Sequence, residues 1–201
     1  MFESNLKTLG LVIVTLVCLI GLLAGCGQGS TSTKDDTNTK EDPQKKEAMY
    51  NLYNKVELKQ TKEQVDTELG VTPTELSTDI YDYADKSGYG VSVGFSSIMA
   101  ADNTTKEVIT KRLSGWEKYL TTAPDADRIT DEQAARITEG MTFDEVKSIL
   151  GTEGFELSRT QNYQSAPAIE RIWIKKGLAS MMSVTFSGPE GTDKVALVAN
   201  V

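Results

Sequence analysis

Histidine is absent from this chain of 201 residues, and cysteine occurs only as Cys18 and Cys26. The lack of histidine excludes nucleophile arrangements that depend on an imidazole base, and it removes a common zinc ligand. Basic residues are also in deficit, with 21 Lys and Arg against 29 Asp and Glu, for a formal net charge of -8. Because nucleic-acid binding needs a basic stripe, we expect no nucleic-acid partner.

Acidic residues cluster at positions 79–85 and 125–132, but neither cluster has the pattern of a metal or catalytic site. The second cluster starts like a calcium loop, yet Ile129 occupies the place of the third ligand and the required glycine is missing. On a strand, Asp79 and Asp85 would share a face while Asp82 points away, so no acid–base pair is expected. The pattern favours a solvated acidic surface, with no metal, no cofactor and no enzymatic activity.

The N-terminus has the order of a secretory signal. Lys7 precedes an apolar run from Leu9 to Ala24, which is shorter than the roughly 20 residues that a membrane-spanning helix needs. The run ends in the sequence LAGC, which resembles a lipobox with Cys26 as the lipidated residue. We expect residues 1–25 to be a cleaved lipoprotein signal peptide, with Cys26 carrying diacylglycerol and palmitate. The alternative is an ordinary signal anchor with an incidental cysteine.

Residues 26–46 then form the predicted tether. From Gly27 to Lys46 the sequence has no large apolar residue, so it cannot bury enough surface to order itself. We expect folding to begin near Glu47, and lipid on Cys26 to hold the domain on the extracytoplasmic face of the cell membrane. Gly27 and the long tether favour a Gram-positive envelope. The mature domain would contain no disulfide and no free thiol.

Two segments, residues 56–70 and 137–151, follow one pattern. Each contains an S/T-x-x-E/Q capping box, beginning at Thr61 and at Thr142, which predicts a helix start. Each ends in a glycine, Gly70 or Gly151, which predicts a left-handed helix end.

The similarity resumes at residues 91–96 and 182–187, where apolar and small polar residues alternate as in half-buried strands. The order of elements predicts an α+β fold of two tandem helix-helix-antiparallel-sheet units. The units span residues 47–114 and 128–201, and residues 115–127 connect them. We expect the helices to pack on one sheet face and to leave the other at least partly open.

The second segment, from Ile137 to Gly151, resembles the I-x-x-G-M-T-x-x-E-V-x-x-x-L-G signature of the superfamily that includes the β-lactamase inhibitory protein and a small outer-membrane assembly lipoprotein. The first segment departs from it, with Lys59 and Gln60 in place of Gly-Met. The resemblance implies the same tandem helix-sheet unit and a role in binding other proteins rather than catalysis.

Aromatic residues on predicted strands are the candidate partner contacts. Alternation places Trp173 on one face with Arg171 and Lys175, opposite two isoleucines. If the isoleucines meet the helices, Trp173 is an exposed anchor between two cations; in the alternative, it packs under neighbouring side chains. Tyr81 and Tyr83 share one face of the first unit and are further candidates.

The sequence thus predicts a membrane-anchored, non-catalytic lipoprotein that binds an extracytoplasmic protein, with modulation or inhibition of an envelope enzyme as one form of that role. The first alternative is a lipoprotein that binds a small ligand or a cell-wall polymer, which requires a concave pocket. The second is an enzyme that uses carboxylates alone, which requires two of them facing one cleft.

Overall fold

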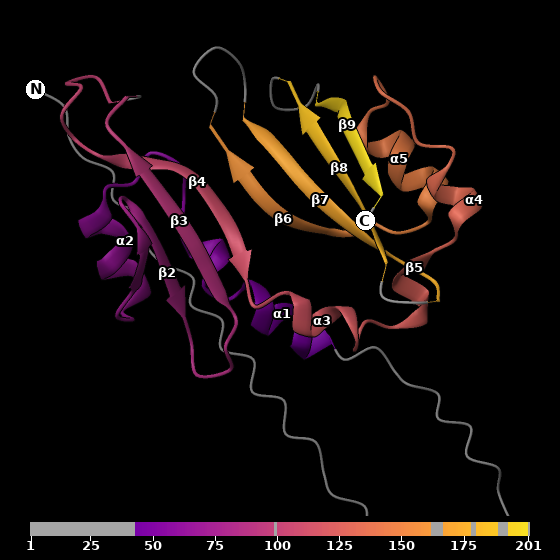
Figure 1. Ribbon diagram of the computed structural model, residues 1–201, viewed down its shortest axis with the longest axis horizontal. Helices are drawn as coiled ribbons and strands as arrows, with labels where there is room; N and C mark the ends of the chain where they lie inside the picture. Colours follow the sequence, from indigo (N-terminus) through magenta and orange to yellow (C-terminus); the bar gives the residue numbers. More distant parts are fainter. Residues whose placement is uncertain (1–42, 99, 162–166, 178–179, 189–192, 201) are drawn as a thin grey trace, which may run out of the picture. The chain divides into compact units, whose positions relative to one another are not determined.

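The computed structural model describes residues 43–98, 100–161, 167–177, 180–188 and 193–200. These residues form an α+β fold in which a few short helices pack on a single nine-stranded sheet (Figure 1). The strand order is β1-β2-β3-β4-β6-β7-β8-β9, and every neighbouring pair in that order is antiparallel. The short strand β5 pairs with β7 in parallel.

The strands are β1 (Thr74–Ser77), β2 (Ile80–Ala84), β3 (Gly90–Ser96), β4 (Glu107–Ser114), β5 (Arg128–Ile129), β6 (Phe155–Thr160), β7 (Ala168–Lys175), β8 (Met181–Ser187) and β9 (Lys194–Asn200). The helices are α1 (Pro43–Tyr50), α2 (Lys62–Leu69), α3 (Glu117–Leu120), α4 (Asp131–Ala134) and α5 (Phe143–Leu150), with 3₁₀ turns η1 (Tyr53–Lys55) and η2 (Asp125–Asp127).

Helix α1 starts at Pro43, about one helical turn before Glu47, near which folding was expected to begin. The predicted signal peptide, Cys26 and the tether up to residue 42 lie outside the described residues. Within the part of the chain that the structure describes, no helix is long and apolar enough to cross a membrane.

Both predicted helix starts and ends are confirmed. The Thr61 hydroxyl accepts from the Gln64 N–H at 3.4 Å, and the Gln64 side chain accepts from the Thr61 N–H at 2.8 Å. Thr142 and Glu145 make the same reciprocal pair at 3.3 and 2.8 Å. Because Gly70 (φ 62°) and Gly151 (φ 73°) adopt the left-handed conformation that glycine tolerates best, they end α2 and α5.

The strands of the two predicted units join into one sheet. Strands β4 and β6 pair from Thr110 to Arg112 against Ser158 to Thr160. One hydrophobic core also crosses the join, with Phe155 of β6 packing on Trp116 and Tyr119. The prediction of two separate tandem units is therefore wrong at this level, because the facing edges of β4 and β6 satisfy each other's backbone groups.

The register defines the two faces of the sheet, because directly opposite residues on paired strands point to the same side. One row runs Tyr81, Val93, Lys111, Arg159, Ile169 and belongs to what we call the helix face. The other row runs Asp82, Ser92, Arg112, Ser158, Glu170, Thr185, Leu197 and belongs to what we call the open face.

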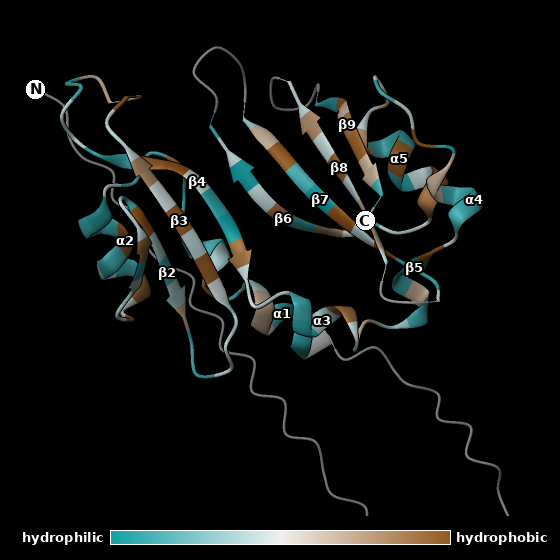
Figure 2. Cartoon of the chain, viewed as in Figure 1, coloured by the Kyte–Doolittle hydropathy of each residue, from teal (hydrophilic) through white to brown (hydrophobic). Residues whose placement is uncertain are grey.

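Helices α2 and α5 pack on the helix face, where Val65 and Val146 are completely buried. Strand β7, in which the polar pair Glu170 and Arg171 is followed by the apolar run Ile172–Ile174 (Figure 2), is buried on both sides near its end. Trp173 joins the core under α5, whereas Ile172 and Ile174 join the core with residues of α3. The connector that contains α3 therefore covers the other side at this point, which the sequence did not predict.

Candidate functional site

Glu170 of β7 is the centre of a hydrogen-bond network on the open face. Its carboxylate accepts from Arg112 Nη1 at 2.7 Å, from Ser158 Oγ at 3.1 Å and from Ser183 Oγ at 2.9 Å. The donors come from β4, β6 and β8, so one carboxylate ties together four strands. We call these four residues the Glu170 network.

The register explains why these side chains meet. Arg112, Ser158 and Glu170 are consecutive members of the open-face row across β4, β6 and β7. Thr110 and Thr160 form the adjacent pair, with their hydroxyls 2.9 Å apart. Apart from Arg112 and Glu170 these side chains are short, so the middle of the open face presents hydroxyl groups and few long side chains.

The network remains accessible to solvent and has apolar neighbours on both sides. The Arg112 side chain is 47% exposed and that of Glu170 is 25% exposed. Ile80, which is 40% exposed, and Leu197, which is 57% exposed, lie on the same face towards the two ends of the sheet. A polar centre of mostly short side chains, with an exposed apolar residue on each side, is suited to contact with a partner surface.

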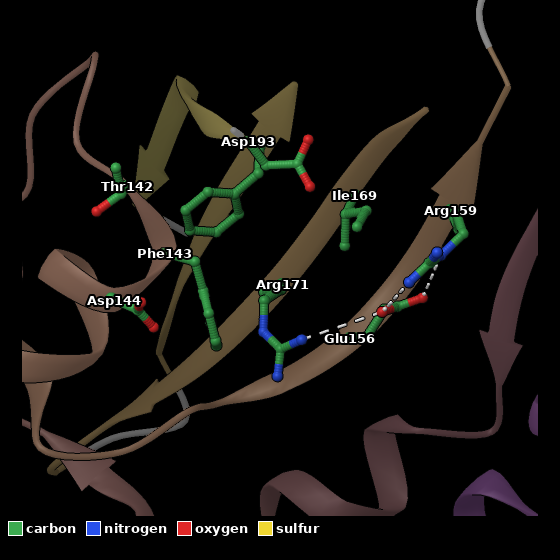
Figure 3. A pocket seen from close by; sticks show the side chains of 9 residues that line it. Thr142, Phe143, Asp144, Glu156, Arg159, Ile169, Arg171 and Asp193 are labelled. Atoms are coloured by element: carbon green, nitrogen blue, oxygen red, sulfur yellow. Dashed lines mark hydrogen bonds and ion pairs between the residues drawn. The ribbon is translucent and has the colours of Figure 1, made fainter. Parts of the chain in front are cut away.

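The helix face carries a second network, around Glu156 of β6 (Figure 3). Its carboxylate accepts from Tyr53 Oη at 2.7 Å and from Arg159 Nε and Nη2, both at 3.1 Å. Arg171 Nη1 lies 4.0 Å from Glu156 Oε2, and Tyr50 Oη donates to the Glu156 backbone oxygen at 2.8 Å. We call these residues the Glu156 network; it joins η1 and α1 to the sheet.

Burial and hydrogen bonding shift pKa values in this network. Burial alone would raise the pKa of Glu156, but the hydrogen bonds from Arg159 and Tyr53 outweigh it and hold that pKa below its usual value. Burial, followed by the nearby Glu156 charge, raises the pKa of Tyr53. Glu156 is therefore an ionised acceptor whose oxygens are already engaged, which makes it a poor general base.

Lys111 of β4 is the one buried charged residue among those described. Its Nζ donates to the backbone oxygens of Val56 at 2.6 Å and Tyr53 at 3.3 Å, and it lies 4.3 Å from the centre of the Tyr53 ring. Burial is the main cause that lowers its pKa. These contacts hold η1 against the sheet, so we assign Lys111 a structural role.

Two hollows of about 310 and 470 Å³ open on the helix face, and Glu156, Arg159 and Arg171 line both. The smaller hollow adds the apolar side chains of Phe143, Ile169 and Phe186 to these charges. Its size and mixed lining are compatible with a small ligand that has both apolar and charged parts.

Trp173 is completely buried, so the packed alternative is confirmed and the exposed anchor is wrong. Its Nε1 donates to the Thr152 backbone oxygen at 3.0 Å, and its ring packs on Phe186. The premise that Ile172 and Ile174 meet the main helices failed, because Trp173 itself faces α5.

The two cations beside Trp173 are also engaged within the chain. Arg171 lies 4.7 Å from the centre of the Phe143 ring, and its Nε donates to the Glu153 backbone oxygen at 3.1 Å. Lys175 Nζ forms an ion pair with Asp131 at 3.1 Å. They do not form a surface group with an aromatic ring between them.

Tyr81 and Tyr83 share one face, as predicted, but it is the helix face. Tyr83 is completely buried and donates to Asp66 at 2.7 Å, and burial followed by that hydrogen bond raises its pKa. Tyr81 is half-buried beside Phe95, with Lys62 Nζ 4.7 Å from its ring centre.

Sequence reasoning missed the Glu170 and Glu156 networks because each depends on which strands pair. Glu170 and Arg112 are far apart in sequence and meet only through the β4–β6 join. The usable signal was the small polar residues that alternate with apolar ones at 91–96 and 182–187, which predicted half-buried strands. Within the described residues, no group of three or more Asp, Glu, Cys or His side chains is placed to hold a metal ion.

We compared the sequence with protein-family models and with curated proteins, and neither comparison finds a match.

Proposed function

We propose that the protein is a lipid-anchored, extracytoplasmic module that binds a partner protein through the open face of its sheet and catalyses no reaction. The observation that carries this proposal is the Glu170 network, an accessible polar centre between the exposed side chains of Ile80 and Leu197. Arg112 keeps most of its donors after bonding Glu170, and arginine is enriched at protein interfaces.

The chemistry of the open face favours a protein over a small molecule. Short side chains such as Ser92, Ser158 and Ser183 let a partner surface approach the sheet closely. Glu170 already has its hydrogen-bond partners, so it is held in one orientation and a partner need not order it first.

We also propose that residues 47–114 and 128–201 arose as tandem copies of one helix-helix-sheet unit, despite their merger into a single sheet. Both halves have a β-bulge in the same place, between Glu75 and Ser77 and between Glu156 and Ser158. An isolated bridge joins each capping residue to the last strand of its half, Thr61 to Glu107 and Thr142 to Lys194. With the signature from Ile137 to Gly151, these features support membership of the β-lactamase inhibitory protein-like superfamily, and with it modulation or inhibition of an envelope enzyme.

A photo-activatable residue in place of Thr185, which lies opposite Glu170 on the open face, tests the binding face in the full-length protein in its native membrane. We expect it to form a covalent adduct with one partner protein. The matched control replaces Ser148, which is exposed on α5, and should form no such adduct. Equal adducts at both positions, or none at Thr185, would contradict the proposed face.

Charge reversal at the centre of the face provides a second test. Arg112→Glu places a carboxylate beside Glu170 and should reduce the yield of the Thr185 adduct about tenfold. Arg136→Glu makes the same charge change at an exposed position outside the sheet and should leave that yield unchanged. An unchanged adduct yield in Arg112→Glu would show that the Glu170 network does not contribute to partner binding.

The anchor is tested separately. Cys26→Ser removes the thiol that would carry the lipid, so the protein should no longer incorporate labelled palmitate. Cys18→Ser should leave palmitate incorporation unchanged. An unaltered protein that incorporates no palmitate and keeps residues 1–25 would support a signal anchor instead.

The smaller hollow on the helix face favours a second candidate function, the binding of a small ligand or a cell-wall fragment. Purified wall fragments should then raise the melting temperature of the protein, and Phe143→Ala should abolish that shift. If no fragment changes the melting temperature of the unaltered protein, this candidate fails.

A further inference from the structure

Strand β9 forms one end of the sheet, and its outer edge is only partly covered. Val195 donates its N–H to the Met141 oxygen at 2.8 Å and accepts from the Gly140 N–H at 2.9 Å. From Leu197 to Ala199, β8 is the only strand among the described residues that pairs with β9. Uncovered backbone N–H and C=O groups on an edge are a template for another strand.

Strand β4 shows what this kind of edge accepts. Val108 donates to the Gln60 oxygen at 2.8 Å and accepts from the Lys59 N–H at 2.9 Å, which repeats the arrangement at Val195. The bulge that follows Val108 in β4 also follows Val195 in β9. After that bulge β4 pairs with β6 from Thr110 to Arg112, so the matching stretch of β9 has room for an antiparallel strand.

The side chains of the two edges differ in charge. The pairing stretch of β4 includes Lys111 and Arg112, and the strands beyond it supply Glu156 and Glu170. From Val195 to Ala199 strand β9 carries no charge and no proline, two of the features that protect an edge. Leu197, on the open face, is 57% exposed.

The opposite end of the sheet cannot supply the missing strand. Strand β1 shares its bulge with β6, but it ends at Ser77, and the chain turns at Asp79 with φ 64°. The residues that would correspond to Arg159 and Thr160 are therefore already in the turn. If β1 of another copy paired with β9, it would lack strand residues equivalent to Arg159 and Thr160, which in β6 pair with β4.

We propose that β9 of a second copy of this chain pairs antiparallel with this edge about a two-fold axis centred on Val198. The pairing sets Val198 opposite its own copy and Leu197 opposite Ala199, a large residue against a small one. It brings no like charges together, whereas β4 pairing with itself would oppose two lysines at Lys111. A two-fold contact of this kind closes, so it produces a dimer and not a filament.

Cysteine cross-linking in the full-length protein tests this geometry. Val198→Cys preserves a small apolar side chain, and directly opposite strand residues lie at a separation that a disulfide can bridge. Mild oxidation should give a covalent dimer from this variant. Ser148→Cys on α5, and the parent chain with its own cysteines, should give only background. A Val198→Cys yield no higher than these controls would overturn the proposal.

A second variant keeps the test independent of the introduced cysteine. Leu197→Lys adds an edge charge at an exposed position, and the dimer dissociation constant from sedimentation in detergent should rise about tenfold, or about 1.4 kcal/mol. Ser148→Lys makes the same charge change on α5 and should leave the constant unchanged. A protein that is monomeric throughout, or a dimer that is insensitive to Leu197→Lys, would also overturn it.

Discussion

The two halves of the sheet share their backbone features but use matching side chains differently. Tyr83 and Trp173 occupy matching positions, are both completely buried, and each gives its polar end one hydrogen bond. Glu75 and Glu156 precede the same bulge, yet Glu75 is exposed and Glu156 is the centre of a network. A shared local pattern therefore determines the backbone, whereas the chemistry of each position depends on what packs against it.

The difference between Glu75 and Glu156 comes from the β4–β6 join. That join places the segment before α2 beside the second half, so Tyr50 and Tyr53 reach Glu156. Glu75 lies on the outermost strand, opposite Tyr81, and β1 has no strand on its other side among the described residues. The two carboxylates thus differ because one lies at an internal junction and the other at an edge.

The largest effect should follow from removing the Trp173 ring. Trp173→Ala leaves a cavity under α5 and an unbonded Thr152 oxygen, so the free energy of unfolding should fall by about 4 kcal/mol. Urea denaturation followed by circular dichroism measures it. Trp173→Phe keeps much of the apolar volume and should retain more than half of that stability. Near-normal stability of Trp173→Ala would contradict the buried placement.

The matched pair Glu156→Gln and Glu75→Gln tests the comparison directly. Glu156→Gln removes the charge to which Arg159 donates two hydrogen bonds, so we expect the free energy of unfolding in urea to fall by about 2 kcal/mol. Glu75→Gln should change stability by less than about 0.5 kcal/mol, because exposed positions tolerate such changes. Equal losses in the two variants would show that the positions are not distinguished by their surroundings.

The features that the sequence predicted are local ones. The capping boxes at Thr61 and Thr142 and the left-handed glycines depend on residues within a single helical turn, so the pattern was sufficient to place them. Alternation also predicted that Tyr81 and Tyr83 share a face. It could not tell which face the helices cover, because both sides of a strand at a sheet junction can be buried.

The misplaced residues all depend on long-range pairing. Alternation around Trp173 predicted a strand that is buried on one side only. The connector with α3 buries the side of Ile172 and Ile174 as well, so both sides of the strand are covered. The Glu170 network needs the register of β4, β6, β7 and β8 together, and no short stretch of sequence contains it. The sequence therefore predicted that one sheet face is at least partly open, but it did not predict which residues lie at the centre of that face.

Acid should reduce the difference in the free energy of unfolding between the wild-type protein and Glu156→Gln. The folded state holds the pKa of Glu156 below its unfolded value of 4.5. The stability that this shift contributes is therefore fully present above pH 4.5 and is lost as the pH falls through the folded pKa. Urea denaturation at pH 7 and at pH 3 should show a smaller gap between the two proteins at pH 3. If the difference in the free energy of unfolding were larger at pH 3 than at pH 7, the ionised form of Glu156 would destabilise the folded state.

The smallest effects should come from the two helix caps, where the halves are most alike. Thr61→Ala and Thr142→Ala each remove one hydroxyl acceptor from a capping box, and each should cost about 1 kcal/mol in urea denaturation. The two costs should agree within about 0.5 kcal/mol, because in each half the box starts a helix of the same length whose first residues face the last strand of that half. Thr67→Ala on the exposed side of α2 is the control and should cost less than either cap. A large difference between the two caps would show that tertiary surroundings outweigh local pattern even at the helix starts, as they already do for Glu75 and Glu156.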